Sequence, residues 1–530
     1  MRIQPATHAG PTPLPPMPQH PRQPLMFGSA TPQTPTPAAE PAKRGFRYLL
    51  FLLKQRLFST PAATPVTPCQ QKALLPMTPL RFDATNASAN KVGSEHGLDL
   101  PKEFAAHREQ VAGIVKDLYA TKDEEGGWKK WLNLGYNTQL AEDVSQYAQS
   151  VKDQYSDMVV LGIGGSSLGG YAMLKALLDP NWNLLSEKER NGYPRFHFVE
   201  NVDADQITSL QKHLDPKKTL FVVISKSGTT PETMAGFMIF KQWLQDKLGA
   251  GEVKNHIAAI TDKTTGVLRP LADTEGYPSF EVPDDVGGRF SVFSAVGLLP
   301  AALCGVDVKE LQRGIRDLDA QLQNPDIDQN IAAQNALIQY LMYNKGKDIS
   351  VFMPYSTRLS AVAAWYTQLW AESLGKQKDL KGNDVFVGPT PVPAVGATDQ
   401  HSQVQLFNEG PNNKILTFVQ VKNPDNDVTI PDQLQGVAKL DYLRKQPLHR
   451  LMTAELDGTK DNLTANQRPN VTLSIPRIDA YYFAQLLYLL EVQTAIAGEL
   501  FGINTYDQPG VEGGKKRAEA YLNQQTTPTR

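Results

Sequence analysis

Cysteine is scarce in this sequence: the 530 residues include only Cys69 and Cys304. Two thiols are too few for a disulfide framework or a cysteine-rich zinc site, which fits a reducing compartment. The chain also has no large excess of charge of one sign, since it contains 53 lysines and arginines and 55 aspartates and glutamates. The chain therefore has no overall basic field for nucleic acid, and any anionic ligand must be held by local groups.

A long uninterrupted hydrophobic run is absent as well. The apolar segment 480–502 contains Gln485, Glu491, Gln493 and Glu499, so it predicts a buried helix and not a membrane span. We expect neither a membrane nor a nucleic-acid partner, and we predict a cytoplasmic location.

Residues 1–80 form a leader that is rich in proline, threonine, alanine and glutamine, with Glu40 as its one acidic residue. Such a composition cannot bury enough apolar surface to offset the entropy cost of ordering the backbone. We expect this leader to be disordered. The composition becomes globular after Met77, so the folded part could begin there, and the leader is then a tail, a targeting stretch or a mis-assigned start.

From residue 157 onward, short β-branched runs alternate with helical patterns, which predicts parallel sheets with crossover helices. Strands are expected at 158–161, 196–199, 220–224, 256–260, 349–353, 414–421 and 471–475. We predict two α/β domains, over 81–305 and 306–500, with ligands at the carboxyl ends of their strands. A helix near 511–523, in a final segment 501–530, is expected to dock back across both domains.

Two loops that follow predicted strands are candidates for binding phosphate. The first, LGIGGSSLGG at 161–170, would let backbone N–H groups approach an anion, but alone it also fits a dinucleotide loop or a tight turn. The second, SKSGTTPET at 225–233, brings hydroxyls and free N–H groups to a helix start. An ordinary N-cap would explain one hydroxyl and leave the others unexplained, so we favour a cradle for a terminal phosphate.

Four further segments supply charged and titratable groups. PDDVGGRFS at 283–291 places Arg289 beside paired glycines, and a fixed guanidinium suits a developing enediolate oxygen. The segments 368–376, 398–403 and 507–515 carry Glu372, His401 and Lys515. Taken singly, these three residues are equally typical of a solvated carboxylate, a structural histidine and a surface lysine. Only their combination is specific.

These blocks, in this order, resemble the glucose-6-phosphate isomerase family of the compact bacterial type, from about residue 81 to the C-terminus. The resemblance implies an α/β fold of two sugar-isomerase (SIS) domains, each an α/β/α sandwich with a mainly parallel sheet, plus a C-terminal helix. It implies an aldose–ketose isomerase that interconverts glucose 6-phosphate and fructose 6-phosphate in glycolysis and gluconeogenesis. The same resemblance implies that ring opening precedes a cis-enediolate and that neither a metal nor another cofactor is required.

By this resemblance the catalytic base falls on Glu372, the ring-opening histidine on His401, the C-terminal lysine on Lys515 and the enediolate-stabilising arginine on Arg289. The substrate-binding positions fall on Gly165, Ser166, Ser225, Lys226, Ser227, Thr230, Thr233, Gln368 and Gln508. The resemblance also implies a homodimer or a dimer of dimers, in which His401 could be contributed across the interface.

Two alternatives stay open. The same domain type serves as a non-catalytic sugar-phosphate sensor, but a sensor needs only the phosphate cradle, so Glu372, His401 and Lys515 together favour an enzyme. An isomerase active on mannose 6-phosphate is the closer alternative, because selectivity at the second carbon depends on the geometry of the pocket.

Overall fold

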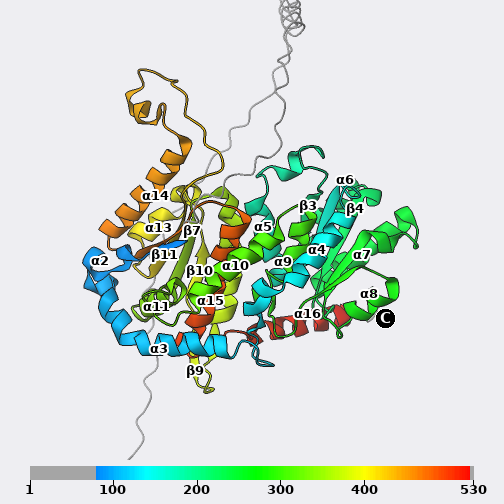
Figure 1. Ribbon diagram of the computed structural model, residues 1–530, viewed down its shortest axis with the longest axis horizontal. Coiled ribbons are helices and arrows are strands. Elements are labelled where there is room, and N and C mark those ends of the chain that lie inside the picture. Colours follow the sequence, from blue (N-terminus) through cyan, green and yellow to red (C-terminus); the bar gives the residue numbers. More distant parts are fainter. Residues whose placement is uncertain (1–78, 526–530) are drawn as a thin grey trace, which may run out of the picture. The chain divides into compact units, whose positions relative to one another are not determined.

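The computed structural model describes residues 79–525 (Figure 1). The expectations about a disordered leader and a start at Met77 concern residues that lie almost entirely outside this part, so they stay predictions. Between residues 79 and 525, no helix is both long and apolar enough to cross a membrane.

The first of two five-stranded sheets has the order β3–β2–β4–β5–β6, with every pairing parallel. Its strands are β2 (Asp157–Leu161), β3 (Arg195–Val199), β4 (Thr219–Ile224), β5 (Ile257–Thr261) and β6 (Ser279–Glu281). The chain runs from β2 to β3 on one side, then crosses to β4 and continues to β5 on the other. The switch point of this sheet therefore lies between β2 and β4, where an open α/β sheet has its ligand crevice.

The second sheet has the order β1–β12–β11–β7–β10. Its strands are β1 (Arg81–Asp83), β7 (Ile349–Pro354), β10 (Thr390–Pro393), β11 (Lys414–Val421) and β12 (Asn470–Ile475). All pairings are parallel except that of β1, which joins the edge antiparallel to β12. The chain leaves β7 toward β10 and leaves β11 toward β12, so the switch point of this sheet lies between β7 and β11. The two sheets thus share one topological plan.

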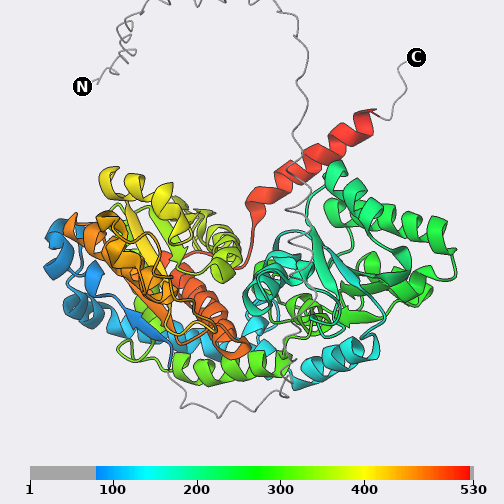
Figure 2. The same cartoon turned by 90° about the horizontal axis from the view of Figure 1, so that it is seen from above.

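Helices connect and cover the strands (Figures 1 and 2). Those in and around the first sheet are α4 (Thr138–Ser150), α5 (Leu168–Leu177), α6 (Ala204–His213), α7 (Pro231–Leu248), α8 (Leu268–Glu275) and α9 (Ala295–Leu303). The others are α2 (Ala89–His96), α3 (Leu100–Ala120), α10 (Val308–Leu322), α11 (Ile331–Asn344), α12 (Ser360–Leu374), α13 (Val404–Glu409), α14 (Leu448–Ala465) and α15 (Ala480–Phe501). A small hairpin pairs β8 (Lys376–Lys378) with β9 (Asp384–Val387). Together these elements confirm the predicted α/β fold with two mainly parallel sheets.

The helix α15 lies at the centre of the core. Every residue from Tyr481 to Gly498 is buried, because α15 packs against α10, α11 and α12. A helix that is apolar on all sides needs such surroundings, and the predicted buried helix over 480–502 is confirmed. The largest hydrophobic cluster includes Val160 of the first sheet and Leu473 of the second. The boundary between two domains near residue 305 stays a prediction.

The expected docking of the C-terminal helix is not found. Helix α16 (Glu512–Gln525) follows the turn at 507–510, but all residues from 507 to 524 are exposed. Figure 2 shows it as the red helix that leads away from the other helices. Its sequence has no apolar stripe to bury, since Tyr521 and Leu522 are neighbours and are 66% and 69% exposed.

Candidate active site

The glycine-rich loop after β2 contacts the segment that carries Arg289. The loop runs through a short 3₁₀ turn, Gly164–Ser166, into α5, as the sequence predicted. A Cβ atom at Gly165 would lie 2.1 Å from the carbonyl carbon of Gly288 and 2.7 Å from the backbone nitrogen of Arg289. Only a glycine lets the two backbones approach so closely. The loop therefore sets the position of the 3₁₀ turn Gly288–Phe290.

The hydroxyl-rich loop after β4 lies at the same edge of the sheet, because β2 and β4 are adjacent and parallel. The hydroxyls of Ser225 and Thr230 are 3.1 Å apart, and those of Ser227 and Thr229 are 2.8 Å apart. The Ser225 hydroxyl also accepts from the backbone N–H of Gly228 at 3.0 Å. The loop then enters α7 at Pro231, so its hydroxyls gather at a helix N-terminus, where an anion is favoured.

Two further side chains border this cradle. Thr233, on the first turn of α7, is buried, and its hydroxyl has no partner within the described chain. Lys226 donates from Nζ to the carbonyl of Pro283 at 3.2 Å, and its ammonium lies 5.2 Å from the centre of the Trp128 ring. Lys226 is thereby held between β4 and the loop that contains Trp128.

Arg289 is the centre of the site. It is 3% exposed, and burial lowers the pKa of its guanidinium while the neighbouring Glu372 acts in the opposite sense. All of its donor hydrogens have acceptors. Nε donates to the Ser373 hydroxyl at 2.8 Å, Nη1 to Gln508 Oε1 at 2.9 Å and to Glu372 Oε2 at 3.3 Å. Nη2 donates to the carbonyls of Thr505 at 2.6 Å and Asp507 at 3.2 Å.

Helix α12 presents Gln368 and Glu372 one turn apart on the same face. Gln368 Nε2 donates to Glu372 Oε1 at 3.2 Å, so the two carboxylate oxygens are held by different partners. The Glu372 side chain is 34% exposed and opens into a cavity of about 440 Å³. That cavity is lined by Ala371, Glu372, Gly375, Lys376, Gln377 and residues 508–511. The carboxylate is therefore both oriented and accessible, as a proton-transfer group requires.

Lys376 lies behind the carboxylate, just past the end of α12. Its Nζ donates to the carbonyl of Glu372 at 2.5 Å and to the carbonyl of Asp507 at 3.0 Å. Burial first, and the charge of Arg289 second, lower the pKa of Lys376 to about 8. Arg289 and Lys376 together hold the segment 505–508 against the helix that carries Glu372.

The described chain does not bring every predicted residue to this point. His401 is exposed at the end of the 3₁₀ turn Thr398–His401, and no contact joins it to Glu372 within residues 79–525. Lys515 pairs with Glu512 on exposed α16 at 3.0 Å. Ser166 is at the end of its turn, next to Gly165. Glu372, Arg289, Gln368, Gln508 and Gly165 therefore form one group, and the roles of His401 and Lys515 stay predictions.

Three residues of the site had no assigned role at the level of sequence. Ser373 and Lys376 follow Glu372 in the chain, and their proximity to the carboxylate was the available signal. Thr505 contributes only its carbonyl, which no pattern of side chains could indicate.

The chain is similar to known sugar-phosphate isomerases. The family described as "Phosphoglucose isomerase" matches residues 139–530. A relative named "Glucose-6-phosphate isomerase" from Carboxydothermus hydrogenoformans is 42% identical over 425 residues, which cover 80% of this chain and 90% of the relative. One of the same name from Thermus thermophilus is 37% identical over 415 residues, covering 78% of this chain and 95% of the relative.

Solved structures agree with the fold. A crystal structure of a hypothetical protein from Thermus thermophilus has a TM-score of 0.76 and 36% identity, and the match covers 84% of this chain and 99% of that chain. A glucose-6-phosphate isomerase from Chlamydia trachomatis has a TM-score of 0.69 at 23% identity, over 82% of this chain and 88% of that one, which supports the fold alone. The resemblance inferred from the motifs is confirmed, and this chain belongs to the phosphoglucose isomerase family.

Proposed function

We propose that this protein interconverts glucose 6-phosphate and fructose 6-phosphate by moving one proton between adjacent carbons. The observation that supports this most directly is the ion pair between buried Arg289 and Glu372, whose carboxylate opens into a cavity. The relatives named above support the choice of substrate. The alternative of a non-catalytic sensor leaves the oriented, accessible carboxylate without a purpose.

In this proposal Glu372 is the base. It removes a proton from one carbon of the open-chain sugar and returns it to the next, through a cis-enediolate. The donors on its two oxygens, from Gln368 and Arg289, keep the carboxylate in one orientation, which favours a reactive geometry. The fixed charge of Arg289 offsets the charge that develops on the enediolate oxygen and needs no reorganisation to do so.

Gln508 has a specific part in this step. Because all donor hydrogens of Arg289 already have acceptors, a substrate oxygen must replace one of them. The Oε1 atom of Gln508 is the acceptor that can leave, since Gln508 is exposed and its neighbours 509–511 line the cavity. The acceptors from Ser373 and Thr505 are buried and stay in place. Gln508 therefore makes room for the substrate and then contacts it.

The hydroxyls of Ser225, Ser227, Thr230 and Thr233 bind the terminal phosphate, with the Lys226 ammonium beside them. The unpartnered Thr233 hydroxyl supports this role, because a buried hydroxyl without a partner is costly unless a ligand completes it. Ser166 and the N–H groups next to Gly165 contact the sugar from the neighbouring strand end. Binding of the non-reacting phosphate then positions the reacting carbons.

Ring opening needs a second pair of groups, and we assign it to His401 and Lys515. Neither lies at Glu372 in the single chain, so we propose a homodimer in which His401 reaches the site of the partner subunit. The test is to mix a Glu372→Gln protein with a His401→Ala protein after mild dissociation. One intact site per mixed dimer should restore measurable turnover. Absence of any recovery in verified mixed dimers would place His401 in its own subunit's site or outside catalysis.

The substrate proposal is tested with fructose 6-phosphate in D₂O, followed by NMR of the products. Glucose 6-phosphate with deuterium at the second carbon is expected, because a proton held on Glu372 can exchange with solvent. Mannose 6-phosphate as the main product would favour the phosphomannose alternative, and no product would favour a sensor. A cytoplasmic location, where these sugar phosphates are metabolised, belongs to the same proposal.

A further inference from the structure

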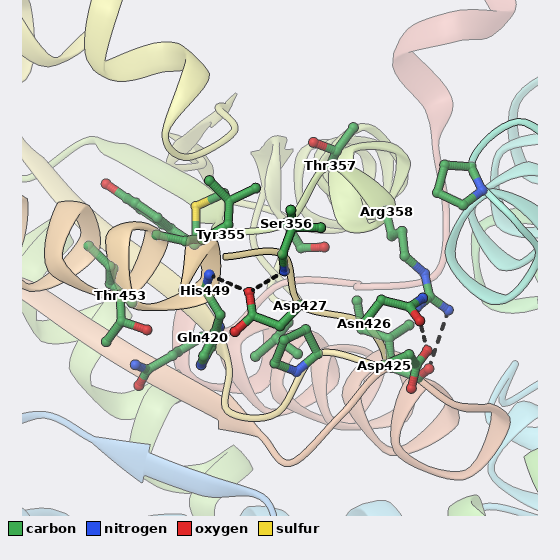
Figure 3. A pocket seen from close by; sticks show the side chains of 18 residues that line it. Tyr355, Ser356, Thr357, Arg358, Gln420, Asp425, Asn426, Asp427, His449 and Thr453 are labelled. Carbon is green, nitrogen blue, oxygen red and sulfur yellow. Dashed lines mark hydrogen bonds and ion pairs between the residues drawn. The ribbon is translucent and has the colours of Figure 1, made fainter. Parts of the chain in front are cut away.

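The second sheet has a cavity at the position that corresponds to the substrate cradle of the first. The cradle lies at the switch point between β2 and β4, and the equivalent switch point of the second sheet lies between β7 and β11. A cavity of about 300 Å³ is found there (Figure 3). Residues 355–358 follow β7 and residues 424–428 follow β11, and both segments line it. Open α/β sheets bind ligands at such points. The proposed isomerase reaction uses none of the residues that line this cavity.

The floor of this cavity is apolar. Tyr355, Leu456 and Ile478 line it and are 4%, 1% and 6% exposed, so each is held by packing and presents only a small part of its surface to the cavity. The Tyr355 ring is also fixed through its hydroxyl, which accepts from Gln400 Nε2 at 2.7 Å. Met452, from α14, also lines the cavity and adds a polarisable side chain to it. A flat, largely apolar ring is the kind of group that such a floor accommodates.

The rim of the cavity carries an available carboxylate. Asp427 Oδ1 accepts from the backbone N–H groups of Val428 at 2.9 Å and His449 at 3.0 Å. These bonds, led by the one from His449, hold the pKa of Asp427 below its usual range, so the group is ionised at neutral pH. Both of these bonds end on Oδ1, which leaves Oδ2 placed to accept from the hydroxyl groups of a ligand.

The cavity does not suit a phosphate. Its one guanidinium, that of Arg358, is already used by Asp425 at 2.7 Å and by the carbonyls of Ala176 at 2.7 Å and Ile478 at 3.3 Å. The two aspartates of the rim, Asp425 and Asp427, repel an anion. The cradle of the first sheet, with its run of hydroxyls and Lys226, has the opposite character. The two switch points are thus alike in topology and different in chemistry.

We propose that the cavity between β7 and β11 binds an uncharged nucleoside. The base lies on the Tyr355 side of the apolar floor, and the two ribose hydroxyls donate to Asp427, as an acidic residue does in other switch-point sites. The hydroxyls of Ser356 and Thr453, which line the walls, bond the edge of the base. A volume of about 300 Å³ lies at the small end of the range for ligand pockets, which suits a nucleoside without phosphates.

The proposal is tested by calorimetric titration of the full chain with adenosine. We expect one site per subunit with a Kd of about 10⁻⁴ M or tighter, the efficiency usual for a ligand of this size. Asp427→Asn should weaken binding at least tenfold, and 2′-deoxyadenosine should lose about as much on the wild type. Asp425→Asn is the matched control on the same loop, and it should change the Kd less than about threefold, since its carboxylate is occupied by Arg358.

Several results would overturn the proposal. It fails if adenosine does not bind at millimolar concentration, or if the two asparagine variants lose equal affinity for adenosine. It also fails if AMP or inorganic phosphate binds more tightly than adenosine. Thr453→Trp, which fills the cavity from α14, gives a second check and should abolish binding. Isomerase activity, which uses none of these residues, shows whether each variant is folded. If a neighbouring subunit covers the cavity, adenosine will not bind to the assembled protein, and the proposal fails.

Discussion

Lys376→Met should change the stability of this protein in a manner that depends on pH. The Lys376 side chain lies between the carbonyls of Glu372 and Asp507 and is 8% exposed. Its pKa is lowered to about 8 from an ordinary value of 10.5. The difference of about 2.5 corresponds to about 3 kcal/mol that the charged lysine costs the folded state at pH 7.

The sign follows from proton binding. Between pH 8 and 10.5 the unfolded chain binds more protons at Lys376 than the folded chain does, so the contribution of this residue to stability rises as the pH rises. Methionine removes both the charge and the two hydrogen bonds, which contribute about 1 kcal/mol each. The variant should be about 1 kcal/mol more stable than the wild type at pH 7 and about 2 kcal/mol less stable above pH 10.

The measurement is urea unfolding of both proteins at pH 7 and pH 10.5, followed by tryptophan fluorescence. Lys347→Met is the matched control, because burial lowers the pKa of Lys347 to about 8 as well, and Lys347 hydrogen-bonds Asn412, away from the site. Both variants should gain stability relative to the wild type as the pH falls from 10.5 to 7, but only Lys376→Met should lower kcat, because Lys376 contacts the segment of Gln508 and Lys347 does not. A pH-independent stability difference for Lys376→Met, or equal loss of kcat in both variants, would refute this reasoning.

Three further predictions concern the reaction. Glu372→Gln should retain binding of fructose 6-phosphate and lose at least about 10² to 10⁴ in turnover; near-normal turnover in a coupled assay would eliminate Glu372 as the base. Arg289→Ala should lower kcat on the order of 10² to 10³, whereas Lys226→Ala should mainly raise KM, and the same kinetic pattern in both would show that these roles are misassigned. Gly165→Ala places a Cβ atom 2.1 Å from the carbonyl carbon of Gly288, so the Arg289 segment must shift and kcat should fall about 10²-fold; unchanged kinetics would mean that the loop does not position the arginine.

The strands that the sequence predicted are those with short runs rich in β-branched or aromatic residues and with several buried positions. All seven are found to within one residue at each end, because strands such as β2 are buried along their whole length and a short β-branched run has few other uses. The sequence did not predict β1, β6, β8, β9 and β10. These strands have three or four residues and few buried positions, and β1 and β10 form sheet edges, so tertiary pairing and not local pattern defines them.

The site was predictable where its residues follow strands or share a helix face. The meeting of Gly165 with Gly288, and of Gln368 with Glu372, follows from loops at one sheet edge and from the helical repeat. The carbonyl of Thr505 and the lowered pKa of Lys376 were not predictable, because they depend on where a distant segment returns in space. The exposed helix α16 illustrates a different limit of prediction from sequence. The amino-acid pattern predicted the helix correctly but did not determine which surface it packs against.

The hydrogen-bond partners of Arg289 also determine when, during synthesis of the chain, the site can become active. Thr505, whose carbonyl accepts from Nη2, is 216 residues further along the chain than the arginine. At about 5 to 20 residues per second, the ribosome adds that distance in about 10 to 40 s. During this interval the first sheet can be complete, but the carbonyls of Thr505 and Asp507 have not yet been synthesised. The Arg289 guanidinium therefore lacks these two acceptors and is still exposed to water. A nascent chain can therefore be folded around β2 and β4 and still be inactive, because the segment that holds Arg289 is synthesised after the strands of both sheets.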